Sequence, residues 1–100
     1  MPIIETETLL VGAARTLRVT VKREDGVQQA ASVFRVRTMK PDGSTTSTIL
    51  GVEPSTVSTY RADFNFIEVG EWTVRMESDS PDGTWEKVYR VLASRFTSPN

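Results

Sequence analysis

The residues that could do chemistry in this chain are carboxylates, hydroxyls, arginines and aromatics, because it has no histidine and no cysteine. Without histidine, the chain lacks the usual general base at neutral pH and the commonest zinc or copper ligand. Without cysteine, disulfides, thiolate metal sites and thiol nucleophiles are excluded. Serine and threonine are abundant, but no Ser-x-x-Lys spacing supplies a base. We therefore expect no enzymatic activity.

Carboxylates gather near one turn, where Glu77, Asp79 and Asp82 are close in sequence, and Asp42 and Asp63 could approach them in space. A calcium site needs six to eight convergent oxygens. The Asp-Ser-Pro-Asp-Gly run lacks the alternating acidic spacing of a calcium loop, and Pro-Asp-Gly is ordinary turn chemistry. We expect no metal and no cofactor.

A basic row is formed by Arg35 and Arg37, which share one face of a strand, and by Lys40 at its end. Such a row could grip a phosphate or an acidic partner surface. It could equally pair with acidic residues on a neighbouring strand or discourage edge-to-edge association. We favour the cross-strand pairing.

We expect the two tryptophans to differ in how deeply they are buried. Trp72 alternates with Val74 in a strand and is expected in the core. Trp85 begins a strand just after a turn, where exposure is more common, although core packing is again favoured. If Trp85 is exposed with Tyr89 or Tyr60, the rings could form a platform for a sugar, which makes a small carbohydrate-binding module the alternative function.

The stretch Tyr60 to Met76 indicates the class of protein that positions these side chains. Apolar and polar residues alternate on both of its arms, and Gly70 stands between them. Since successive residues of a strand face opposite sides, each arm places an apolar row inward. We expect the arms to form a hairpin. The apolar rows are Tyr60, Ala62, Phe64 and Phe66 on the first arm and Trp72, Val74 and Met76 on the second.

Five further strands are expected, and no segment keeps the spacing of an amphipathic helix. They are an opening segment ending at Val11, a strand over 17–21, one over 32–39, a threonine-rich edge strand over 44–50 and a last strand over 85–92. Asp-Gly and Pro-Asp-Gly pairs punctuate them. The chain is expected to be all-β, a sandwich of about seven antiparallel strands.

One hundred residues fit a single domain, 1–100, with enough chain for one core. Residues 94–100 are expected to fray. Residues 1–10 are a first strand or an N-terminal arm, because no turn signal ties down Ile3, Ile4, Leu9 and Leu10. If they form an arm that adds a strand to a neighbour, deleting residues 1–10 should abolish assembly and leave a folded monomer.

Charge and hydropathy argue against two classes of partner. Twelve basic and 13 acidic residues give a net charge of −1, so there is no overall attraction to nucleic acid or an anionic membrane. The N-terminus has neither the basic nor the apolar region of a signal peptide, and no apolar run approaches the roughly 20 residues of a membrane span. We expect cytoplasmic synthesis without a leader.

A family resemblance adds to this picture. The runs Ser58–Phe64 and Val69–Arg75, with the closing Tyr89-Arg90-Val91, resemble the penultimate hairpin and last strand of immunoglobulin-like domains of filamin and bacterial types. The resemblance implies an immunoglobulin-like sandwich and says little about function. In size and style the chain also resembles accessory proteins of phage and prophage virions, which are parts of heads, connectors and tails.

Together these features favour a non-enzymatic structural or protein-interaction domain, which is virion-associated if the second resemblance holds. Its partners would be proteins or further copies of itself, in a homo-oligomer. The working surface is expected at a sheet edge, the N-terminal arm or the rim around Trp85. The candidate interaction residues are Ile3, Ile4, Leu9, Leu10, Trp85, Tyr89, Arg35 and Arg37.

Overall fold

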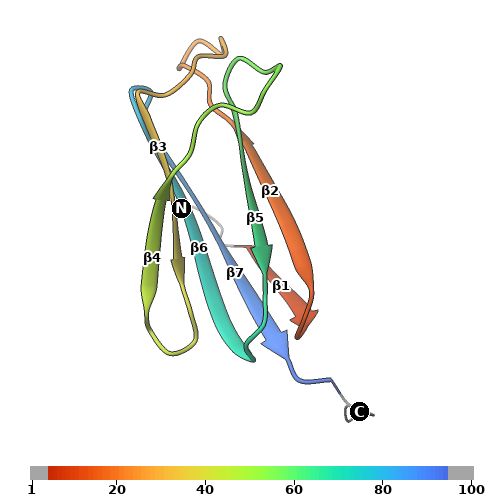
Figure 1. The fold of residues 1–100 in the computed structure, drawn as a ribbon. Helices are drawn as coiled ribbons and strands as arrows, with labels where there is room; N and C mark the ends of the chain where they lie inside the picture. Colours follow the sequence, from red (N-terminus) through yellow and green to blue (C-terminus); the bar gives the residue numbers. More distant parts are fainter. Residues whose placement is uncertain (1–4, 95–100) are drawn as a thin grey trace.

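The computed structural model describes residues 5–94, which form seven strands and no helix. Figure 1 shows them as two facing layers. The strands are β1 (Glu5–Leu10), β2 (Ala14–Thr20), β3 (Val33–Met39), β4 (Thr45–Ile49), β5 (Thr59–Asn65), β6 (Gly70–Asp79) and β7 (Gly83–Leu92). One sheet has five strands in the order β1-β7-β6-β3-β4, and the other pairs β2 with β5. The expectation of an all-β, sandwich-like fold is confirmed.

The expected hairpin between the arms of 60–76 is wrong, because β5 and β6 lie in different sheets. β5 pairs with β2, whereas β6 pairs with β3 and β7. The chain crosses from one layer to the other between Asn65 and Gly70, and Gly70 has a φ of 130°. The apolar rows of β5 and β6 still face the same core. Strands in two packed sheets both point their inner side chains into the space between the sheets, just as two strands of a hairpin share one inner face.

The strands are not all antiparallel. β1 runs parallel to β7, with Glu5 opposite Lys87 and Leu10 opposite Leu92. Leu9 is consequently buried in the core. Residues 5–10 thus form a strand of the main sheet and not a free arm, while residues 1–4, including Ile3 and Ile4, lie outside the described part. Of the tail expected to fray, residues 95–100 also lie outside it.

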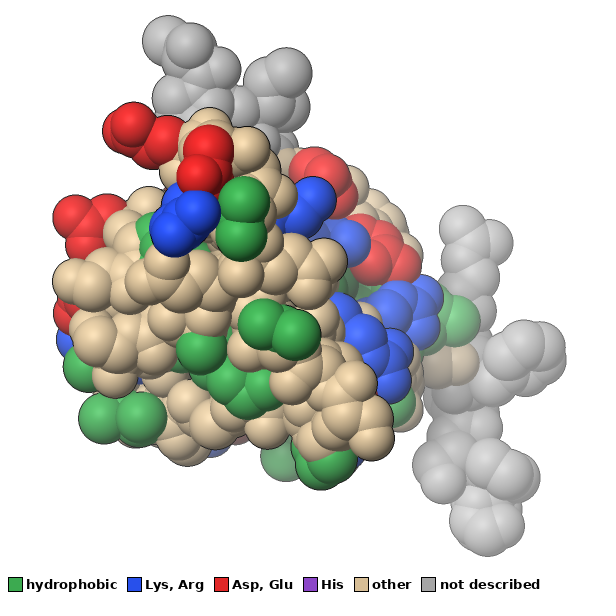
Figure 2. Space-filling view, turned by 90° about the horizontal axis from the view of Figure 1, so that it is seen from above, with side chains coloured by type: hydrophobic (Ala, Val, Ile, Leu, Met, Phe, Trp, Pro, Cys, Tyr) green, Lys and Arg blue, Asp and Glu red, His purple; other side chains and the backbone are tan. Residues whose placement is uncertain are grey.

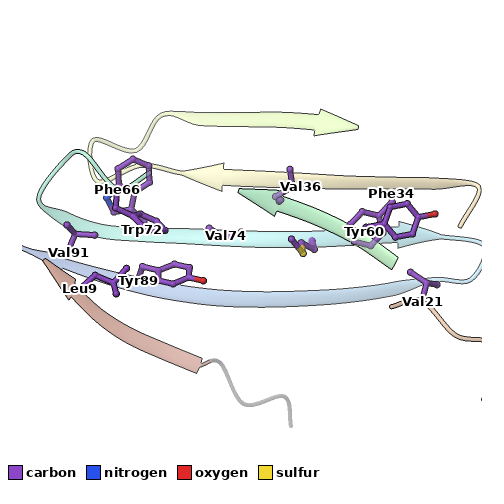
Figure 3. Close-up of a cluster of buried hydrophobic side chains, with 12 residues drawn as sticks. Leu9, Val21, Phe34, Val36, Tyr60, Phe66, Trp72, Val74, Tyr89 and Val91 are labelled. Atoms are coloured by element: carbon purple, nitrogen blue, oxygen red, sulfur yellow. The ribbon is translucent and has the colours of Figure 1, made fainter. Parts of the chain in front are cut away.

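Aromatic side chains join the two layers at both ends of the core (Figure 3). Phe34 of β3 stacks on Tyr60 of β5 with ring centroids 4.1 Å apart. Toward the other end, Phe66 meets Trp72 edge-on at 5.3 Å and Tyr89 at 4.6 Å. Trp72 is buried as expected, and its ring nitrogen donates to the carbonyl of Glu68 at 2.9 Å. Such pairs add specific geometry to the burial of large apolar area.

Two strands cannot cover five, so the flanks of the larger sheet remain partly open. On one flank, the inner surface of β6 and β7 projects past β2. On the other, β3 and β4 project past β5. The inner-facing residues at these flanks are therefore less buried than the alternation of the sequence alone predicts.

Candidate interaction surfaces

A groove of about 490 Å³ lies on the open flank beside β2. Residues of four strands, β1, β2, β6 and β7, line the groove, and they include charged residues such as Glu5 and Lys87. The groove exists because the second sheet covers only part of β7. Tyr89 and Val91 are buried beneath that sheet, but Trp85 on the same face of β7 remains 37% exposed. We call this surface the Trp85 groove. Its apolar lining is Leu17, Val19, Val74, Met76 and Trp85.

Trp85 is held against the backbone of its own turn. A Cβ added at Gly83 would lie 2.8 Å from the Trp85 ring, so the absent side chain of glycine makes room for the indole. The ring centroid is 6.1 Å from that of Phe34, in a tilted arrangement. Trp85 is therefore both a core neighbour and an accessible ring, a combination common at protein-binding sites.

Lys87, which lines the Trp85 groove, belongs to a set of ion pairs that joins three strands. Glu7 of β1 accepts a hydrogen bond from Nε of Arg15 on β2 at 2.9 Å, and its Oε1 lies 3.2 Å from Nζ of Lys87 on β7. The hydrogen bond from Arg15 holds the pKa of Glu7 below its ordinary value. Partial burial lowers the pKa of Lys87, but the bond with Glu7 and the charge of Glu5 raise it overall.

Two members of the predicted basic row, Arg35 and Arg37, form cross-strand ion pairs. Arg35 contacts Glu77 and Asp79, each at 3.2 Å, and Arg37 lies 3.7 Å from Glu77. Arg75 also reaches Glu77, at 2.9 Å. The hydrogen bond with Glu77 is the largest cause that raises the pKa of Arg35. The pairing interpretation is confirmed for Arg35 and Arg37, whose guanidinium groups already contact carboxylates.

Acidic residues near the β6–β7 turn also have local structural partners. Asp79 pairs with Arg35, and Asp82 accepts a hydrogen bond from the backbone N–H of Ser80 at 3.1 Å. Asp42 similarly accepts from the backbone N–H of Ser44 at 2.8 Å. Within residues 5–94, no cluster of three or more potential ligands is arranged to hold a metal ion.

The prediction that Tyr89 or Tyr60 forms an exposed aromatic platform with Trp85 is wrong. Tyr89 is fully buried and Tyr60 is 2% exposed. Burial raises the pKa of the Tyr89 phenol, and no described protein group makes a hydrogen bond to its hydroxyl. The alternation put Tyr89 on the same face as Trp85, but the second sheet covers only the Tyr89 end. Sugar stacking would therefore depend on Trp85 alone.

The predicted arm residues separate into two environments. Leu9 is buried, so it cannot belong to an exposed working surface. Leu10 points the other way and is 57% exposed. One residue of shift along a strand reverses the side chain, which is why neighbouring leucines differ so strongly.

A surface of exposed apolar side chains lies at one end of the sandwich, and we call it the apolar end. Only one of its members, Leu10, was predicted from the sequence as a candidate interaction residue. Backbone contacts bring its parts together: Val11 N–H donates to Leu92 C=O at 2.9 Å, and Gly12 N–H donates to Phe66 C=O at 2.7 Å. Ile67 is the most exposed member, at 69%. The signal available in the sequence was the presence of apolar residues at the last position of a strand or just past it. The members are Leu10, Val11, Ile67, Val69 and Leu92.

The opposite end of the sandwich differs in character. It carries the β2–β3, β4–β5 and β6–β7 connections, and Figure 2 looks onto it. Hydrophobic side chains there stand in small groups separated by backbone and other side chains (Figure 2). Large contiguous apolar patches mark interaction sites more often than scattered residues do. The apolar end is therefore the stronger candidate.

Comparison with known proteins does not assign a family. No family model matches the chain, and no curated protein is significantly similar to it. Across residues 5–94, no helix has the length and apolar character needed to cross a membrane.

Proposed function

We propose that this chain is a non-enzymatic structural or protein-interaction domain with an immunoglobulin-like sandwich. Seven strands in two facing sheets support the fold type, together with the resemblance of Ser58–Phe64 and Val69–Arg75 to such domains. Arg35 and Arg37, which could have formed a charged site, are instead paired with carboxylates across strands. The exposed features that remain are sheet edges and apolar side chains, and both are suited to protein recognition.

The apolar end carries this proposal. Leu10 and Leu92 lie opposite each other on neighbouring strands, and both are exposed on the same face. Val69 precedes Gly70, and Gly70 pairs with Val91 of β7, the residue next to Leu92. Within residues 5–94, twelve apolar side chains are buried in the core while these five remain exposed. Covering the five with a partner would remove apolar area from water and so lower the free energy.

We further propose that the partner belongs to a phage or prophage virion, where the chain would be an accessory part of a head, connector or tail. Small size and the resemblance to such proteins support this. The chain should then co-purify with particles released from its source after prophage induction. Recovery of particles that lack the chain would contradict the virion assignment and leave protein interaction open.

A matched pair of variants tests the interaction itself. Ile67→Asp places a charge on the apolar end, whereas Val57→Asp places the same charge on a residue of similar exposure in the β4–β5 connection. Capture of the partner from source lysate should fall at least tenfold for Ile67→Asp and remain unchanged for Val57→Asp. Equal capture by both variants would show that the apolar end is not the binding surface.

A further inference from the structure

We infer that β4 is a self-pairing edge through which two copies of this chain join their five-stranded sheets. β4 lies at the end of the strand order and, within residues 5–94, pairs with β3 alone. All five of its residues, Thr45–Ile49, are exposed, and none is charged or proline. Natural edge strands are usually blunted by charges, prolines or bulges. β4 carries none of these devices.

The hydrogen bonds to β3 show which backbone groups of β4 are free. Leu50 N–H donates to Phe34 C=O, and Lys40 N–H donates to Ser44 C=O, both at 2.9 Å. Hydrogen-bonded residues alternate along an antiparallel pair. The even-numbered residues of β4 therefore point their backbone N–H and C=O groups toward β3. Thr45, Ser47 and Ile49 point theirs away from β3, toward the open edge of the sheet.

These three outward residues match a second copy of themselves. In an antiparallel pair with the symmetry axis at Ser47, Ser47 faces its own copy and Thr45 faces Ile49 of the other copy. Each such pair exchanges both N–H···O bonds. Only this register uses the whole strand. It also opposes hydroxyl and β-branched side chains without any like charges, and such cross-strand pairs are stabilising.

The other edges are less suited to a second copy. Both edges of the two-stranded sheet stop short of the edges of the larger sheet, since the Trp85 groove lies beside β2 and β3 and β4 extend past β5. A second copy brought to β2 would set its own projecting flank against that of the first. β1 is the remaining projecting edge, and it carries Glu5 and Glu7, which two copies would bring toward each other.

Contact through β4 would also cover exposed apolar surface. Ile49 is 72% exposed and points to the outer face, beside Arg35 in the register. In the paired dimer, the Ile49 side chain would lie against Thr45 of the other copy. Within each copy, Thr45 pairs with Met39 of β3. Met39 is itself 48% exposed. The pairing therefore adds apolar contact to backbone hydrogen bonds, as in strand addition generally.

This inference rests on the proposed interaction function and is tested separately from it. The chain has no cysteine, so single-cysteine variants report proximity without background. Ser47→Cys should form a disulfide-linked dimer under mild oxidation, because residues facing each other across the axis have Cα atoms about 5.5 Å apart. Thr45→Cys is the matched control. Its two copies would lie about 14 Å apart along the strands and should not link.

Light scattering across a concentration series should show wild-type dimers, and Ser47→Lys should weaken dimerisation at least tenfold by placing two ammonium groups at the axis. Thr45→Lys should have a smaller effect, since it faces Ile49. A wild-type chain that stays monomeric, or equal cross-linking of both cysteine variants, would overturn the β4 pairing. Neither result would affect capture through the apolar end, so the two proposals can fail independently.

Discussion

Glu7 and Arg15 connect the two sheets, because Glu7 belongs to β1 of the larger sheet and Arg15 to β2 of the smaller one, and Nε of Arg15 lies 2.9 Å from the carboxylate. The chain turns between them in three residues, Val11 to Ala13. The ion pair therefore fixes how the chain leaves one layer and enters the other. Lys87 adds a third strand to the same contact.

This ion pair should make stability fall at acid pH. The pKa of Glu7 is lowered from its ordinary 4.5 by the folded structure, so the folded chain holds the proton less tightly than the unfolded chain. The stabilisation is therefore present above about pH 4.5 and is lost as pH falls through the folded pKa. Urea unfolding of Glu7→Gln should show a shallower decline of the free energy of unfolding between pH 5 and pH 3 than wild type.

Asp25 and Asp42, whose pKa values are also lowered, should supply the remaining acid sensitivity. A double-mutant cycle of Glu7→Gln with Arg15→Gln isolates the pair. If the double variant is additive at neutral pH, the ion pair does not contribute to stability.

Adjacent leucines provide a test of where β1 belongs. Leu9→Ala should cost about 2–5 kcal/mol, because Leu9 is buried in the core. Leu10→Ala should change stability by no more than about 0.5 kcal/mol, since Leu10 lies on the outer face. Chemical denaturation of both variants measures the difference. Equal small effects would show that β1 docks only loosely on β7.

Truncation should follow the same logic. Deleting residues 1–10 removes both Leu9 and the whole of β1, so we now expect a strongly destabilised chain and not the intact monomer that a free arm would leave. Circular dichroism and thermal melting distinguish the two outcomes. A cooperative transition at the wild-type temperature would return residues 5–10 to the role of an arm.

Three glycines separate backbone strain from steric overlap. Gly70 has a φ of 130°, and a Cβ there would come within 2.6 Å of Cβ of Pro41. Gly43 has a φ of 87° with open space around it, whereas Gly51 has open space and no such φ. Gly51→Ala should be near neutral, and Gly43→Ala should cost about 1–2 kcal/mol through strain. Gly70→Ala should cost more than Gly43→Ala, and equal melting temperatures of these two variants would exclude the Pro41 contact.

The tryptophans should differ in the cost of their removal. Trp72→Ala should lose about 3–5 kcal/mol, since it deletes a buried ring in contact with Phe66. Trp85→Ala should lose less, because Trp85 is partly exposed at the rim of its groove. Denaturant midpoints of the two variants measure this, and a Trp72→Ala chain that melts like wild type would contradict the packing.

The Tyr89 hydroxyl gives a prediction of opposite sign. It is buried, and among the described protein groups it finds no hydrogen-bond partner. A buried polar group without a partner costs free energy, so Tyr89→Phe should be at least as stable as wild type and up to about 1 kcal/mol more stable. A clear loss of stability in thermal melting would show that the hydroxyl makes a bond in solution.

The sequence by itself determined the class of fold and the rows of side chains that face inward. A strand alternates its side chains with a period of two whatever it pairs with, so Tyr60, Phe66, Trp72 and Val74 could be assigned to the core from local pattern alone. The same reasoning predicted that Arg35 and Arg37 would meet carboxylates across strands.

Only the tertiary structure decided which strands are neighbours and how far each face is covered. Gly70 between two alternating arms is as compatible with a crossing between sheets as with a hairpin, because both leave the inner rows facing the core. Likewise, Trp85 and Tyr89 share one face of β7 but differ in exposure. Their difference depends on which part of β7 the two-stranded sheet covers, and that sheet is built from residues far away in sequence, so no local period encodes it.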